Sequence, residues 1–250
     1  EAALIGKLAA IPNRAGYTTD GRALLLTHRA RVRREIKTVH QVHYYQDMLE
    51  QLGLSPGPDE LFLQLPPETV HWANKFTATT KPGPTIGLNP GAAYGPAKCW
   101  PAERYGALAA RLAKEHDATM LVFGTSADNT VAEAIKAQAP DRIINLAGKT
   151  NLSEAMALIG ACDAFVTNDS GLMHVGAALK TPLVAIFGST DAVATGPYAD
   201  NAMVIQKDLP CRPCLKTHCK SDFRCMTDIT VAEISEAVAV LLENSQKGKP

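Results

Sequence analysis

The stretch AFVTNDSGLMHVGAALKTPLVAIF, residues 164–187, decides the fold class of this chain. It begins and ends with short apolar runs, at 164–167 and 183–187, that are typical of buried strands. Residues 171–179, between the two runs, predict a helix. A strand, a helix and a second strand in this order predict a βαβ unit with parallel strands.

The same alternation extends over most of the chain. Further strands are predicted at 85–88, 119–123, 143–146 and 203–206. Further helices are predicted at 101–116, 127–137, 152–161 and 231–243. Right-handed crossovers place such helices on both faces of a parallel sheet. We therefore expect the α/β class, with a Rossmann-like, doubly wound parallel sheet whose ligands bind at the loops that follow the strands.

Two of these helices begin with recognisable capping residues. Asn151 precedes Glu154 by three residues, which is the spacing of a capping box. Thr230 stands three residues before Glu233 and marks the start of the last helix.

The first third of the chain follows another pattern. Residues 35–53 carry apolar side chains at steps of three and four, which predict a helix that ends at Gly53. Prolines crowd the stretch that follows, and a short helix around 68–76 interrupts it. We expect three segments, with boundaries at 1–55, 56–83 (a linker) and 84–250.

Composition excludes several classes of protein. Hydrophobic residues make up 46% of the 250 and charged residues 20%, so the chain is globular and not intrinsically disordered. Lys+Arg and Asp+Glu both number 25, which argues against a nucleic-acid-binding protein. No apolar run is long enough to span a membrane. The first residues lack a basic segment before an apolar core, so we expect no secretory signal and a cytoplasmic location.

Two loops after predicted strands have the composition of an anion site. Residues 89–101 contain glycines and Lys98 and lead into a helix, so backbone N–H groups and an ammonium could meet a phosphate. The loop is neither a Walker A motif nor a dinucleotide fingerprint, and a plain loop with a surface lysine is the alternative.

The second loop leads into the helix predicted at 171–179. The free N–H groups at its start suit a phosphate, and Asp169 could accept hydrogen bonds from sugar hydroxyls. The alternative is that Asp169 or Ser170 only caps the helix. His174 lies one turn further on, where a structural role is the alternative to a functional one.

Two further clusters leave alternatives open. Four thiols at short spacing could hold Zn²⁺, although the gaps differ from those of a paired zinc ribbon, and reduced, unligated cysteines are the alternative. They are Cys211, Cys214, Cys219 and Cys225. A basic cluster at 14–37 either binds an anionic partner or forms a solvated, salt-bridged face. It consists of Arg14, Arg22, Arg29, Arg31, Arg33, Arg34 and Lys37.

The segments GPAKCWP (95–101) and NDSGLMHVGAAL (168–179) resemble the two donor-side signatures of the ADP-heptose:lipopolysaccharide heptosyltransferases, glycosyltransferase family 9. The spelling of residues 89–112 is most similar to the heptosyltransferase II branch. The resemblance implies a GT-B fold of two Rossmann-like domains. Residues 1–55 would be the remnant of the acceptor-binding domain, and 84–250 the complete nucleotide-sugar-binding domain.

The resemblance also implies an activity. It is the inverting, metal-independent transfer of heptose from ADP-L-glycero-D-manno-heptose to the heptose of the lipopolysaccharide inner core, with no cofactor. The acceptor implies a cytoplasmic enzyme and allows peripheral contact with the inner membrane. The general base of the family is expected in a preceding N-terminal part, so no residue of this chain is assigned that role. The alternative is a non-catalytic nucleotide-sugar-binding fragment or a zinc-stapled interaction module.

Family roles carry over to individual positions. Lys98 matches the lysine that contacts the donor's diphosphate and sugar and stabilises the leaving group. The start of the family's phosphate-binding helix corresponds to Asp169, Ser170 and Gly171. The family's histidine one turn later corresponds to His174. Ser126 or Asp128 is expected at the ribose, and Thr150 at the adenine. No metal ligand is expected.

Overall fold

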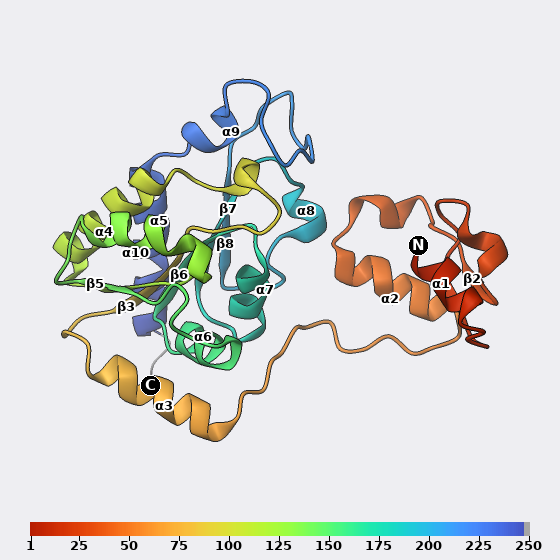
Figure 1. The fold of residues 1–250 in the computed structure, drawn as a ribbon, viewed down its shortest axis with the longest axis horizontal. Helices are drawn as coiled ribbons and strands as arrows, with labels where there is room; N and C mark the ends of the chain where they lie inside the picture. Colours follow the sequence, from red (N-terminus) through yellow and green to blue (C-terminus); the bar gives the residue numbers. More distant parts are fainter. Residues whose placement is uncertain (248–250) are drawn as a thin grey trace. The chain divides into compact units, whose positions relative to one another are not determined.

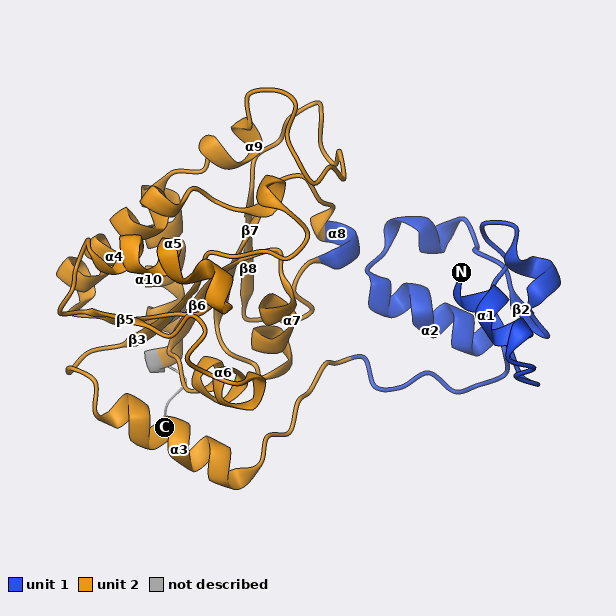
Figure 2. Ribbon diagram, in the orientation of Figure 1, with its two compact units in different colours: residues 1–59, 193–195 blue, residues 60–192, 196–250 orange. Residues whose placement is uncertain are grey.

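The structure is a computed structural model that describes residues 1–247. The chain divides into two compact units, residues 1–59 with 193–195, and residues 60–192 with the chain from 196 onward (Figure 2).

The first unit is small and is built around a pair of short strands. β1 and β2 are parallel, with Ala15 opposite His28 and Tyr17 opposite Ala30. Its elements are α1 (Ala2–Leu8), β1 (Ala15–Tyr17), η1 (Arg22–Leu25), β2 (His28–Ala30), η2 (Glu35–Thr38) and α2 (Gln41–Gln51). Sequence periodicity did not predict α1 or the two strands.

The single helix predicted at 35–53 is wrong in extent. The structure has a 3₁₀ turn, η2, and then a separate helix, α2. His40 separates them with an extended backbone (φ −60°, ψ 148°), and its Nδ1 accepts a hydrogen bond from the N–H of Val42 at 3.2 Å. A side chain that caps α2 in this way starts a new helix rather than continuing an old one. Gly53 follows α2 with φ 76°, a left-handed conformation open to glycine at little cost.

The second unit contains a six-stranded sheet, in which every neighbouring pair is parallel (Figure 1). The strand order is β5-β4-β3-β6-β7-β8. The strands are β3 (Thr85–Asn89), β4 (Thr119–Val122), β5 (Ile143–Asn145), β6 (Ala164–Asn168), β7 (Leu183–Phe187) and β8 (Ala202–Gln206). The predicted fold class, an α/β doubly wound parallel sheet, is confirmed.

Helices cover both faces of this sheet, as the sequence predicts. Successive side chains of β7 alternate between two apolar clusters, because side chains along a strand point to opposite faces. Val184 and Ile186 join the cluster with α4, α5 and α10, whereas Ala185 and Phe187 join the cluster with α6 and α7. These helices are α4 (Ala102–His116), α5 (Asn129–Lys136), α6 (Leu152–Gly160), α7 (Gly171–Ala178) and α10 (Val231–Lys247).

Short elements complete the chain. They are η3 (Pro96–Lys98), η4 (Ser126–Asp128), α8 (Ala192–Thr195) and α9 (Arg224–Thr227). None of the helices among residues 1–247 has the length and apolarity needed to cross a membrane.

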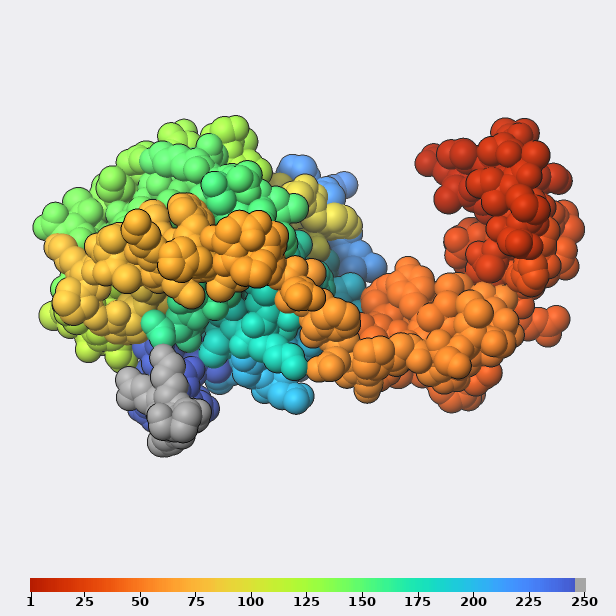
Figure 3. Space-filling view, turned by 90° about the horizontal axis from the view of Figure 1, so that it is seen from below, coloured from red at the N-terminus to blue at the C-terminus, as the bar shows by residue number. Residues whose placement is uncertain are grey.

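The segment predicted as a linker contains a helix that packs on the second unit. This helix, α3 (Pro67–Ala78), contacts α6 and lies along the surface of the unit (Figure 3). Ala73 is fully buried, and Leu65 and Phe76 pack against the cluster that contains α6. Part of the expected linker is therefore a structural component of the second unit.

The strand order reverses at the centre of the sheet. From β3 the chain proceeds outward to β4 and β5, and it then returns to β6 and proceeds outward the other way to β7 and β8. Gly87 in β3 permits close packing here, because a Cβ at this position would lie 2.7 Å from the ring of Phe165. The loops that leave β3 and β6 diverge at this point, which is where open α/β sheets bind ligands.

Candidate functional site

A cavity of about 630 Å³ opens at the carboxyl ends of the central strands. The loops after β3, β4 and β5 and the start of α7 line it. Five of the predicted site residues are in its wall, namely Ser126, Asp128, Thr150, Ser170 and Gly171. The cavity therefore gathers residues from three separate loops that the sequence assigned to one ligand.

One part of the cavity wall is apolar. Phe123 follows β4, Leu152 begins α6, and Leu172 and Val175 belong to α7. Thr150 lies in the same wall, just before α6. Apolar side chains with few polar groups suit the flat face of a heterocyclic base.

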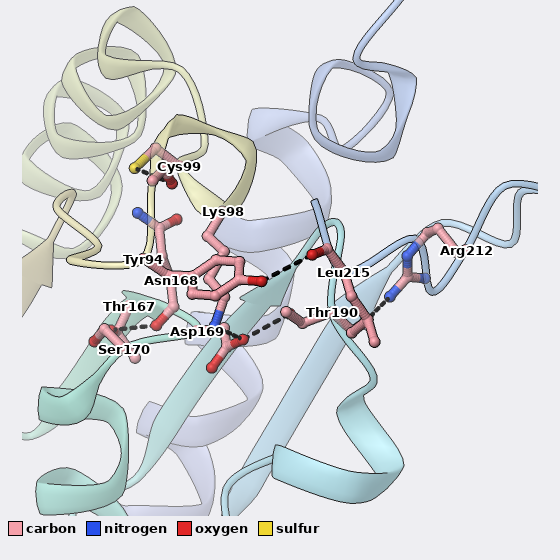
Figure 4. Close-up of polar contacts among 11 residues, drawn as sticks. Tyr94, Lys98, Cys99, Thr167, Asn168, Asp169, Ser170, Thr190, Arg212 and Leu215 are labelled. Carbon is pink, nitrogen blue, oxygen red and sulfur yellow. Dashed lines mark hydrogen bonds and ion pairs between the residues drawn. The ribbon is translucent and has the colours of Figure 1, made fainter. Parts of the chain in front are cut away.

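Lys98 and Asp169 are not in the cavity wall but form an ion pair beside it (Figure 4). The Lys98 Nζ lies 2.6 Å from Oδ2 of Asp169, and their side chains are only 13% and 5% exposed. The hydroxyl of Thr190 donates to the same oxygen at 2.6 Å. Lys98 also lies over the ring of Tyr94, 4.6 Å from its centroid. These contacts hold the ammonium in one place.

The role expected for Asp169 changes with this geometry. Its Oδ2 already accepts from Lys98 and Thr190, so it orients the lysine in addition to any contact with a sugar. Sequence reasoning assigned both Lys98 and Asp169 to the site but missed Thr190, which lies in the loop after β7. The long distance in sequence between these residues left no local signal for the contact.

Ser170 occupies the position before α7 without capping it. Its backbone is extended and its side chain makes no hydrogen bond to the first turn of the helix. Instead, the Nδ2 of Asn89 donates to the Ser170 Oγ at 2.8 Å. The alternative in which Ser170 only caps the helix is therefore wrong. The first turn of α7 faces the cavity with its positive dipole end, a favourable place for an anion.

Asn168 fastens the loop after β3 to the end of β6. Its Oδ1 accepts from the N–H of Trp100 and from the hydroxyl of Tyr105, both at 3.1 Å. Its Nδ2 donates to the carbonyl of Pro90 at 2.7 Å. Asn168 is fully buried, so these bonds fix the loop that carries Lys98. Sequence reasoning did not predict this role of Asn168.

The loop after β4 is closed by a capping box. The N–H and the hydroxyl of Thr125 both donate to Oδ2 of Asp128, at 2.7 and 2.8 Å. Asp128 therefore lines the cavity with one oxygen already engaged. Gly148 lets the next loop approach closely, because its φ is 69° and a Cβ there would lie 2.8 Å from the Cα of Ser126.

The capping boxes that the sequence predicts are present. Asn151 accepts from the N–H of Glu154 and donates its own N–H to the Glu154 carboxylate, both at 2.9 Å. Thr230 and Glu233 are bonded in the same reciprocal way at the start of α10.

His174 lies one turn into α7 and is partly buried. It is not in the described wall of the cavity, in contrast to Ser170 and Gly171.

The four clustered cysteines are free thiols in the structure. Cys211 and Cys219 are exposed, and Cys225 is buried. Burial raises the pKa of the Cys225 thiol, and the nearby Cys219 raises it further. Among residues 1–247, no three His, Cys, Asp or Glu side chains are grouped so that they could hold a metal ion. The zinc site that the spacing allowed is not found among these residues.

The basic cluster of the first unit contains side chains of two kinds. Arg33 lies 3.2 Å from the buried carboxylate of Asp47, which also accepts from the hydroxyl of Tyr17 at 2.8 Å. Arg14 and Arg22 donate to backbone carbonyls of their own unit. These three arginines stabilise the unit. Arg33 is also exposed, and the remaining members are exposed without such a bond being described, namely Arg29, Arg31, Arg34 and Lys37.

Comparisons with known proteins agree with the resemblance. The sequence model of glycosyltransferase family 9 (heptosyltransferase) matches residues 1–223. Lipooligosaccharide heptosyltransferase 2 of Haemophilus influenzae is 36% identical over 219 residues, covering 82% of this chain and 62% of the relative. Lipopolysaccharide heptosyltransferase 2 of Escherichia coli is 35% identical over 223 residues, with the same coverage. The chain thus spans less than two thirds of the length of these relatives.

Solved structures are similar as well. E. coli ADP-heptose lps heptosyltransferase II superposes with a TM-score of 0.77 at 31% identity, over 98% of this chain and 74% of that chain. A family 9 glycosyl transferase from Veillonella parvula superposes with a TM-score of 0.78 at 26% identity, over 97% of this chain and 70% of that chain. E. coli heptosyltransferase WaaC with ADP gives 0.62 at 18% identity, over 88% and 61%, and supports the fold alone.

Proposed function

The chain belongs to glycosyltransferase family 9, and we propose that it forms the donor-binding part of a heptosyltransferase. The reaction is the inverting, metal-independent transfer of heptose from ADP-L-glycero-D-manno-heptose to the heptose of the lipopolysaccharide inner core. The observation that carries the proposal is the Lys98–Asp169 pair beside a cavity that faces the first turn of α7. Relatives of the same family named heptosyltransferase 2 support the choice of donor and acceptor.

We assign the parts of a nucleoside diphosphate sugar to successive parts of the cavity wall. The adenine would lie against the apolar wall of Phe123 and Leu172, near Thr150. The ribose would lie near Ser126 and the free oxygen of Asp128. The diphosphate would meet the N–H groups at the start of α7.

Lys98 and the start of α7 supply the field for bond cleavage. In the transfer, the bond between the anomeric carbon and the diphosphate oxygen breaks, and ADP leaves with the electron pair. The acceptor hydroxyl oxygen bonds to the opposite face of the same carbon and gives up its proton to a base that we assign to no residue of this chain. A cation already fixed by Asp169 and Thr190 stabilises the departing charge without first having to be oriented.

The exposed basic residues of the first unit suit the acceptor. Arg29, Arg31, Arg34 and Lys37 are exposed, and a lipopolysaccharide core carries carboxylates and phosphates. Arginine binds both groups through its two-pronged donor geometry. A cytoplasmic enzyme in peripheral contact with the inner membrane would meet this acceptor.

A second candidate is a protein that binds the nucleotide sugar without transferring it. It is favoured by one feature of the assignment, namely that none of the residues proposed to contact the donor is assigned as a base. Both candidates share the same cavity, so only an assay of transfer separates them.

The test uses the protein expressed from its complete gene. Calorimetry with ADP, and with UDP as a matched control, measures nucleotide binding, and an assay with ADP-heptose and a heptose-terminated core measures transfer. Binding of ADP together with transfer supports the enzyme. Binding without transfer supports the second candidate, and no binding of ADP would refute both.

A further inference from the structure

Arg212 is the most highly connected side chain of the cysteine-rich loop, which we define as residues 207–223. It is not in the wall of the cavity. Its Nη1 donates to the carbonyl of Lys207 at 2.7 Å, and its Nη2 to the side chain of Gln206 at 2.8 Å. It also donates to the loop after β7, through Nε to the carbonyl of Gly188. Its Nη2 donates to the carbonyl of Thr190 at 3.2 Å (Figure 4).

These contacts lead to Lys98 in three steps. Arg212 holds the backbone of Thr190. The hydroxyl of Thr190 donates to Asp169 at 2.6 Å, and the same oxygen of Asp169 lies 2.6 Å from the Lys98 ammonium. Thr190 and Asp169 are both buried, so little solvent competes for these bonds.

The cysteine-rich loop also contacts the segment that carries Lys98. The hydroxyl of Tyr94 donates to the carbonyl of Leu215 at 2.8 Å, and the N–H of Ala97 donates to the carbonyl of Thr217 at 3.0 Å. The N–H of Leu215 donates to the carbonyl of Ser189 at 2.8 Å. One loop therefore braces both the lysine and the segment that positions its partner.

Arginine has the hydrogen-bonding groups needed to hold the cysteine-rich loop against the loop after β7. The loop contains no helix or strand between residues 207 and 223, so its carbonyls lack the regular partners of a sheet. A guanidinium offers five N–H donors in a fixed plane and can hold several carbonyls at once. Lysine carries the same charge on a flexible stem and cannot reproduce this arrangement.

We propose that Arg212 is a positioning residue, which fixes the loop after β7 so that Thr190 and Asp169 hold the ammonium of Lys98 at the donor's leaving group. The inference rests on the proposed function and adds a residue outside the cavity to it. Because Lys98 acts on charge that develops during bond cleavage, loss of its position lowers kcat more than it raises the donor KM.

The experiment compares Arg212→Lys and Arg212→Ala with the unmodified full-length protein in the heptose transfer assay. We expect kcat to fall about tenfold to a hundredfold in both variants, the size of effect that a small misplacement produces, with a much smaller change in donor KM. The matched control is Arg224→Ala, since Arg224 lies on α9 close by in sequence and its exposed side chain pairs with Asp228 at the surface. It should keep the unmodified kcat.

A double-mutant cycle separates positioning from general destabilisation. Thr190→Val removes the hydroxyl that reaches Asp169, so adding Arg212→Ala to it should lower kcat little further. Fully additive losses, or an unchanged kcat in Arg212→Lys, would overturn the proposal. If Arg212→Ala does not fold, Arg212→Lys decides alone. Absence of transfer by the unmodified protein would instead refute the proposed function, and this inference with it.

Discussion

The two sides of the cavity are built in different ways. On the side of β4 and β5, each loop is closed by residues three positions apart, such as Thr125 with Asp128 and Asn151 with Glu154. On the side of β3, β6 and β7, the loops are held by partners far away in sequence, such as Lys98 with Asp169. The first side is held mainly by contacts within each loop, and one hydrogen bond, from the N–H of Gly148 to the carbonyl of Gly124 at 3.0 Å, joins its two loops. The second is one connected network, so a change at one residue displaces the others.

Removal of Lys98 should give the largest effect. Lys98→Ala deletes the charge that the connected side holds in place, and losing one such donor typically costs about 2.7–4 kcal/mol of barrier. We expect heptose transfer to slow about a hundredfold or more, measured as kcat with saturating donor. Near-normal turnover would remove Lys98 from the mechanism.

The control for this variant is Lys180→Ala. Lys180 is 68% exposed and lies 3.1 Å from Glu60 on the surface of the same unit. Its loss should leave kcat unchanged. Thermal unfolding of both variants shows whether a fall in kcat reflects the lost charge or an unfolded protein.

Asn168→Ala tests how strongly the connected side depends on one residue. The substitution leaves the buried carbonyl of Pro90 and the buried N–H of Trp100 without their partner. We expect the free energy of unfolding to fall by about 2–6 kcal/mol, since two groups lose their partner and each costs about 1–3 kcal/mol. Urea denaturation of the full-length protein measures this loss. A loss of stability smaller than that of Asn151→Ala would contradict the difference between the two sides of the cavity.

Asn151→Ala makes the same change, asparagine to alanine, on the side of β4 and β5. It removes a helix cap whose partner is three residues away, so we expect a loss of about 1 kcal/mol. The same urea denaturation measures it. A loss as large as that of Asn168→Ala would show that the two sides are not built differently.

Glu233 bonds both a residue three positions away, Thr230, and a distant one, Lys207. Its replacement should give the smallest change in the free energy of unfolding. Its hydrogen bond to Lys207, aided by the N–H of Thr230, lowers the pKa of the carboxyl to about 2. A lowered pKa stabilises the fold above the ordinary value of 4.5, and this contribution is lost as the pH falls toward 2. The side chain is 39% exposed, so we expect less than about 1 kcal/mol.

The measurement is the difference in unfolding free energy between the unmodified protein and Glu233→Gln. It should be largest near about pH 7 and shrink on acidification to about pH 3. A difference that does not change with pH would assign the effect of the substitution to the cap alone.

The contrast also explains what could be predicted from sequence. The six strands of the second unit, its main helices and the capping boxes at Asn151 and Thr230 depend on residues a few positions apart, and these were predicted. Lys98 and Asp169 were recognised as candidates, but their pairing, and the roles of Thr190, Asn168 and Arg212, depend on contacts between distant loops. Local periodicity carries no information on such contacts.

The errors have the same origin. Periodicity continued a helix through residues 35–53, but a single side chain, His40, starts a new one. Arg33 is exposed and ion-paired, which agrees with the salt-bridged alternative for the basic cluster, but its partner, Asp47, is a buried carboxylate that no local pattern identifies.

The sequence span of the Lys98 network has a consequence for the way the protein is made. A ribosome delivers residues in order, so the loops after β4 and β5 can close as soon as they emerge. The contacts around Lys98 form only after Asp169, then Thr190, and finally Arg212 have been synthesised. A nascent chain halted before Arg212 would contain all six strands of its sheet but would lack the residue that completes the contacts around Lys98.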